Sequence, residues 1–133
     1  IGKIRIPDEI LTKREKLTEE EHKVIKRHPD IAFKMLESMP KLIKIANIVK
    51  YHHEKFNGTG YPEGALGTNI PLESRIISIA DAYEAMTSDR TYRTKMSHEY
   101  AVTEIKRCSG THFDPEIAST FIEKVLPKYI IKD

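Results

Sequence analysis

Hydrophobic residues along this chain recur at helical spacing, and strand-like alternation is not sustained anywhere. An apolar stripe with a period near 3.6 residues runs from Leu42 to Val49 and leads toward His52 and His53. A further apolar face covers residues 72–88. The pattern predicts an all-α fold, a single helical domain of about five to seven helices.

Capping signals place the ends of these helices. Thr18 and Glu21 have the spacing of a capping box, and Asp114-Pro115 has the order of an N-cap followed by proline at the first helical position. Pro40 interrupts the apolar pattern. The expected helices cover residues 18–26, 29–38, 41–53, 72–88, 97–109 and 115–126.

The segment from Glu54 to Pro71 lacks helical periodicity and is longer than an ordinary connector, which is typical of a functional loop. Gly58 and Gly60 allow the backbone to approach a ligand closely, although a plain tight turn explains them equally well. Tyr61 offers a stacking face. With few apolar positions to bury, this loop is expected to be the most mobile internal segment.

Composition narrows the class of protein. The 133 residues suit one domain, and a net charge of +2 gives no indication of nucleic-acid binding. Cys108 is the only cysteine, which excludes an intramolecular disulfide, fits a reducing, cytoplasmic compartment and predicts a small core residue. No apolar run approaches the roughly 18 residues of a membrane span.

The adjacent imidazoles of His52 and His53 are the first candidates for chemistry. Asp81 lies downstream inside an apolar run, so its carboxylate is expected to be buried. Neutral imidazoles and a carboxylate suit Zn, Mn, Fe and related divalent ions. Two alternatives remain open from these residues alone. The histidines also fit a helix C-terminus, and Asp81 also fits a salt bridge with Arg75 or Arg90.

Other charged residues are weaker candidates. Arg90 and Arg93 are suited to bidentate phosphate contacts, but a solvated helix terminus also explains them. Lys3 is a cation in an apolar context. Taken alone, His28 is interpreted as an ordinary residue at a helix junction. The remaining histidines lie in polar contexts and are expected to be surface residues: His22, His98 and His112.

Several of these segments together resemble the HD-GYP family, a subgroup of the HD-type metal-dependent phosphohydrolases. The most specific match runs from His52-His53-Glu54 to Gly60-Tyr61-Pro62. Further matches are Ile1-Gly2-Lys3-Ile4, Ile70-Pro71-Leu72-Glu73, Ile79-Ala80-Asp81, Ser88-Asp89-Arg90 and the run from Gly110 to Pro115.

The resemblance implies a helical domain that hydrolyses cyclic di-GMP at a centre of two or three divalent metals, with iron or manganese expected. Carried over by position, the implied metal ligands are His28, His52, His53 and Asp81. The groups implied to hold substrate phosphate are Lys3, as the catalytic cation, Arg90 and Arg93. Gly60 and Tyr61 belong to the loop implied to line the substrate pocket.

The chain also departs from the family pattern. The His-Asp pair that names the family would lie immediately before Ile1, so residues 1–133 are expected to be an HD-GYP domain truncated at its N-terminus, with an incomplete metal site. Phe56-Asn57 replaces the usual Trp-Asp, and His112 replaces a usual Gln.

Two alternatives to a cyclic di-GMP phosphodiesterase follow. One is a catalytically silent module that binds cyclic di-GMP or a protein partner, such as a diguanylate cyclase-type domain or an upstream receiver or sensor domain. The other is an HD-type phosphohydrolase acting on another nucleotide.

Overall fold

The computed structural model describes residues 1–13, 15–89 and 94–130, and this part of the chain is helical, with isolated bridges but no strand. In the described residues, α1 to α6 and the continuous run from α7 to α8 make seven helices, which confirms the expected all-α class. The elements are η1 (Gly2–Arg5), α1 (Asp8–Leu11), α2 (Glu19–Ile25), α3 (His28–Glu37), η2 (Pro40–Leu42), α4 (Ile43–Lys50), η3 (Gly67–Asn69), α5 (Leu72–Thr87), α6 (His98–Arg107), α7 (Pro115–Thr120), the π-helical turn η4 (Phe121–Val125) and α8 (Leu126–Ile130).

The expected capping signals form. The Thr18 hydroxyl accepts from the Glu21 N–H at 3.2 Å, and the Glu21 carboxylate accepts from the Thr18 N–H at 2.7 Å. Asp114 caps α7 by accepting from the N–H of Glu116 at 2.9 Å. The helix expected over 41–53 is shorter, because α4 ends at Lys50 and the two adjacent histidines lie in the turn that follows it.

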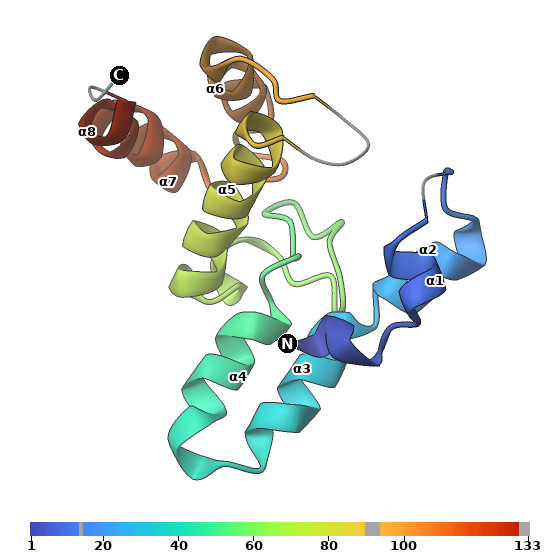
Figure 1. Cartoon of the computed structure of the whole chain (residues 1–133). Coiled ribbons are helices and arrows are strands. Elements are labelled where there is room, and N and C mark those ends of the chain that lie inside the picture. The colour runs from blue at the N-terminus through green and yellow to red at the C-terminus, as the bar shows by residue number, and fades with distance from the viewer. Residues whose placement is uncertain (14, 90–93, 131–133) are drawn as a thin grey trace.

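A close backbone contact and a hydrogen bond hold the helices around this turn against one another. Figure 1 shows α3 and α4 as neighbouring helices, with the N-terminus close to the start of α3. Gly2 lets η1 approach α3 closely, because a Cβ there would lie only 1.9 Å from the backbone oxygen of His28. The Ser74 hydroxyl donates to the Ile48 carbonyl at 2.8 Å and so fixes α5 against α4.

The main core cluster lies among α5, α6 and the start of α7. Its buried members are Ile79, Ile105, Cys108, Phe113 and Ala118. Cys108 is therefore the core residue that the composition predicted. Only one face of α5 enters this core. No helix in the described parts of the chain has the length and apolar character that crossing a membrane requires.

The loop between α4 and α5 is tied to the rest of the molecule along its length. The Phe56 N–H donates to the His112 carbonyl at 3.0 Å, and the Asn57 N–H donates to the Thr111 carbonyl at 2.9 Å. The Gly67 N–H closes the loop on the Phe56 carbonyl at 2.8 Å. The premise that few contacts hold this loop is therefore wrong, because polar backbone groups supply the contacts that apolar side chains do not. Its mobility stays a prediction, which hydrogen exchange would measure.

Candidate metal centre

Three histidines from two separate segments meet beside the loop. His28 begins α3, whereas His52 and His53 follow α4. One ring nitrogen from each of the three lies within 4.8 Å of those of the other two, and this is the metal-ligand cluster found in the described residues. The packing of α3 against α4 therefore brings together imidazoles that are 25 residues apart in sequence.

Hydrogen bonds to backbone carbonyls fix the tautomers of two of these rings. His28 Nδ1 lies 2.7 Å from the Ile25 carbonyl oxygen, and His52 Nδ1 lies 2.5 Å from that of Val49. A carbonyl only accepts, so each Nδ1 carries a hydrogen, and a neutral ring held in this way has its lone pair on Nε2, where a ligand binds. This support of the remote ring nitrogen is the arrangement found around metal-binding histidines.

The third imidazole closes the cluster. His53 Nε2 lies 3.1 Å from His28 Nε2, so a proton or a cation must separate the two nitrogens. Burial lowers the pKa of His53 to about 3, with His52, His28 and Lys3 as further causes. Burial likewise lowers the pKa of His28. Both rings are therefore neutral near pH 7, which is the form that binds metal.

We expect the metal-free chain to lose stability as the pH falls from 7 to 5. The ordinary pKa of His28 and His53, 6.5, is lowered by folding, so the unfolded chain binds more protons in this range. For His53 the loss continues toward pH 3. The ceiling is about 1.4 kcal/mol per pH unit for one imidazole, and partial exposure reduces it. Urea unfolding at pH 7 and pH 5 measures the effect.

The matched variants for this test are His53→Gln and His22→Gln. His22 is an exposed imidazole on α2. Replacing His53 should flatten the dependence of unfolding free energy on pH, whereas replacing His22 should leave it as in the parent chain. Equal stability of the parent chain at both pH values would contradict the prediction.

Asp81 lies at the same cavity as the histidine pair but outside the cluster of three imidazoles. The cavity has a volume of about 200 Å³, and its lining includes His52, His53, Ser78 and Asp81. The expectation that Asp81 is buried is wrong, because it is exposed and the apolar run around it does not enclose it. Ile76 and Ile77 on the same helix are 46% and 41% exposed.

Of the two arginines considered as salt-bridge partners of Asp81, Arg75 is engaged by other groups. The Arg75 guanidinium forms an ion pair with Asp114 and donates through Nε to the Ile70 carbonyl at 3.0 Å. Within the described ranges, Asp81 has no ion-pair partner. Arg90 and Arg93 lie outside these ranges.

Tyr61 covers the histidine cluster from the loop. Its ring stacks on His53 with a centroid distance of 5.0 Å and an interplanar angle of 26°. Burial raises the pKa of Tyr61, and the nearby charge of Asp81 raises it further. Gly60 is required for this placement, since a Cβ there would lie 2.3 Å from the Lys55 backbone nitrogen.

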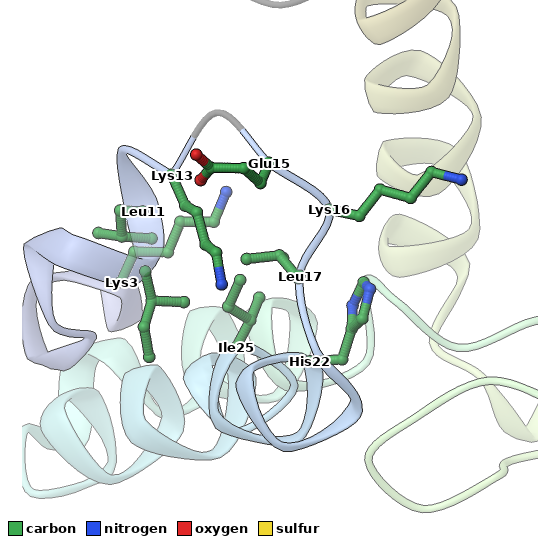
Figure 2. A pocket seen from close by; sticks show the side chains of 9 residues that line it. Lys3, Leu11, Lys13, Glu15, Lys16, Leu17, His22 and Ile25 are labelled. Carbon is green, nitrogen blue, oxygen red and sulfur yellow. The ribbon is translucent and has the colours of Figure 1, made fainter.

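Lys3 lines a different hollow from the one at the histidine pair. Figure 2 shows it among the side chains around a hollow of about 570 Å³, together with Lys13, Leu17 and Ile25. This hollow and one of about 490 Å³ between α5 and the C-terminal helix are larger than the cavity at the histidines. Cavity volume therefore does not identify the candidate site, which is chosen because titratable groups converge at it.

Three site residues have no counterpart among the sequence-based candidates. His112 is exposed, as expected, yet it lines the cavity with His52 and Asp81. Lys26 Nζ lies 5.5 Å from the Tyr61 ring centroid. Glu54 is buried and bonded to the loop backbone. Only Glu54 carried a usable signal, because it stands directly after the histidine pair.

Comparison with known proteins shows the family to which this chain belongs. A family model described as an HD domain matches residues 1–117. The chain belongs to the HD-domain family, which confirms the expected relationship to HD-type proteins. HD domains are metal-dependent phosphohydrolases, and the three convergent imidazoles fit a divalent cation.

Several proteins named as cyclic-dinucleotide phosphodiesterases are similar to this chain in sequence. The cyclic di-GMP phosphodiesterase response regulator RpfG of Xanthomonas campestris pv. campestris is 39% identical over 124 residues, covering 92% of this chain and 33% of the relative. A cyclic di-GMP phosphodiesterase of Vibrio cholerae is 41% identical over 129 residues, covering 92% and 26%. A 3′3′-cGAMP-specific phosphodiesterase of the same organism is 34% identical over 125 residues, covering 92% and 24%. The chain thus spans about a third of these relatives or less.

A solved structure supports the fold. The crystal structure of a cyclic GMP-AMP specific phosphodiesterase of Vibrio cholerae matches with a TM-score of 0.54 and 21% identity. The match covers 100% of this chain and 35% of that one. At this identity the likeness concerns the arrangement of helices alone.

Proposed function

We propose that this chain is part of the catalytic domain of a metal-dependent phosphodiesterase that hydrolyses cyclic di-GMP. The observation that carries the proposal is the convergence of three imidazoles, two of them bonded through Nδ1 to a backbone carbonyl, beside the stacked ring of Tyr61. The relatives named as cyclic di-GMP phosphodiesterases support the substrate class.

The proposed ligands are His28, His52, His53 and Asp81, with iron or manganese as the metal. A bound divalent cation supplies an activated water and neutralises charge on the attacked phosphate. The neutral imidazoles contribute lone pairs without first losing a proton, because burial already keeps the His28 and His53 rings unprotonated near pH 7.

The remaining residues are proposed to bind and orient the substrate. Tyr61 presents an aromatic ring at the cavity, and bases stack readily on such rings. Lys3, Arg90 and Arg93 are proposed to hold phosphate oxygens, with Lys3 as the catalytic cation. Lys3 lies close enough to lower the pKa of His28 and His53, so its charge reaches the same region.

One observation favours a second candidate function. Among the residues described, the compact cluster contains three imidazoles and no carboxylate, whereas Asp81 stands apart from it at the cavity. A site with this donor set supports a module that binds a cyclic dinucleotide, or a signalling partner such as a diguanylate cyclase-type, receiver or sensor domain, without hydrolysing it.

Turnover by the full-length protein separates the two candidates. After loading with Mn²⁺ or Fe²⁺ under reducing conditions, we expect conversion of cyclic di-GMP to the linear dinucleotide or GMP, measured by chromatography. A chelator should abolish turnover, and re-addition of the metal should restore it. 3′3′-cGAMP is the comparison substrate. Binding of cyclic di-GMP without hydrolysis by the metal-loaded protein would contradict the first candidate and support the second.

A further inference from the structure

Glu54 is a buried carboxylate that has no part in the proposed chemistry. It follows His53 directly and is 3% exposed. One carboxylate oxygen accepts from the N–H of Glu63 at 2.7 Å and of Gly64 at 3.0 Å, and the other accepts from the N–H of Ala65 at 3.1 Å. Three successive backbone donors therefore converge on one side chain.

These bonds fold the loop back onto the histidine pair. Gly60 packs against the backbone of residues 54 and 55, where a Cβ would lie 2.5 Å from the Glu54 Cα. The Tyr61 N–H donates to the His53 carbonyl at 3.3 Å. The segment that carries Tyr61 is thus held at one end by residues 53–55 and at the other by the Glu54 carboxylate.

A second anchor of the loop is weaker. Glu63 pairs with Lys50 and accepts from the Tyr51 hydroxyl at 2.7 Å, but its side chain is 49% exposed. Solvent screens such a pair, so it contributes little to the position of the loop. Charge-assisted hydrogen bonds made by a buried carboxylate are stronger.

We propose that Glu54 is a positioning residue that holds Tyr61 over His53 and thereby sets the aromatic face against which a cyclic dinucleotide base stacks. This role rests on the proposed function for its substrate. Its structural basis is independent of that function, because the three hydrogen bonds of the Glu54 carboxylate all go to the backbone of the loop.

The test is Glu54→Gln in the full-length, metal-loaded protein. Glutamine keeps the shape, but its NH₂ group cannot accept, so the bond from the Ala65 N–H is lost. We expect the KM for cyclic di-GMP to rise about tenfold, the lower end for one charge-assisted hydrogen bond. The change in kcat should be smaller and the metal content unchanged. Amide exchange at residues 63–65 should accelerate.

A double-mutant cycle shows whether Glu54 acts through Tyr61. Adding Glu54→Gln to Tyr61→Ala should raise KM no further, because coupled residues are not additive. Glu123→Gln is the control, since this exposed carboxylate accepts only from the Ser119 hydroxyl among the bonds described. Additive effects on KM, or an unchanged KM for Glu54→Gln, would overturn the proposal.

The role of Glu54 can still be tested if the proposed function is wrong. A wild-type protein without turnover contradicts the phosphodiesterase proposal and leaves two measurements that still decide the role of Glu54. These are amide exchange at residues 61–65 and the NMR shifts produced by stacking of Tyr61 on His53. Both should change in Glu54→Gln, and if both stay as in the wild type, Glu54 does not position the ring.

Discussion

Replacing His53 by glutamine is expected to lower the metal affinity of the full-length protein at least about 100-fold, since changes to groups that merely support ligands already cost about 10–100-fold. His53 is the central member of the cluster. Its ring centroid lies 4.9 Å from that of His28 and 3.9 Å from that of His52. Hydrolysis of cyclic di-GMP should fall with metal content, because the proposed chemistry requires the cation. Elemental analysis and chromatography measure the two losses.

The variant His22→Gln serves as the control for this change. It also removes one imidazole, but from the exposed face of α2. Its metal content and turnover should equal those of the parent protein. If His53→Gln kept the full metal content, the three-imidazole cluster would be a packing arrangement, with one shared proton between His28 and His53, and the proposed metal centre would be wrong.

Local signals in the sequence were sufficient to predict most of the helices of the fold. The capping box at Thr18 and the Asp114-Pro115 start of α7 depend on neighbours within a few residues, and both form as expected. The end of α4 was less predictable, because the apolar stripe continues toward His53 while the chain leaves the helix at Tyr51. Directly after this point the chain is contacted by the returning loop, at residues 53–55, and such a contact has no periodic signature in the sequence.

The candidate site was only partly predictable from the sequence, because it also depends on contacts between segments that are far apart in the chain. The histidine pair stands out in the sequence, but its meeting with His28 depends on the packing of α3 against α4. Asp81 shows the limit of apolar context as evidence of burial. The run around it is apolar, yet the buried residues of α5 are Ser74 and Ile79, and Asp81 remains exposed at the cavity.

The ion pair of Arg75 with Asp114 gives the largest expected effect on stability. Both side chains are nearly buried, at 15% and 9% exposure. Arg75→Met removes one partner and leaves the Asp114 charge buried, a change that typically costs about 3–5 kcal/mol. We expect the lower end, about 3 kcal/mol, because Asp114 keeps its bonds from the Glu116 and Ile117 N–H groups. This corresponds to a fall in Tm of about 10 °C.

Two matched variants complete this test and connect it to the site. Lys44→Met breaks the pair with Glu73, whose side chains are 79% and 43% exposed, so it should change the unfolding free energy by less than about 1 kcal/mol. Asp81→Asn should also change stability little, because Arg75 is engaged by Asp114 and Asp81 is exposed. Its effect should instead appear as weaker metal binding in the full-length protein. A large drop in Tm for Asp81→Asn with unchanged metal content would show that Asp81 is a structural counter-ion, and the salt-bridge alternative would then hold.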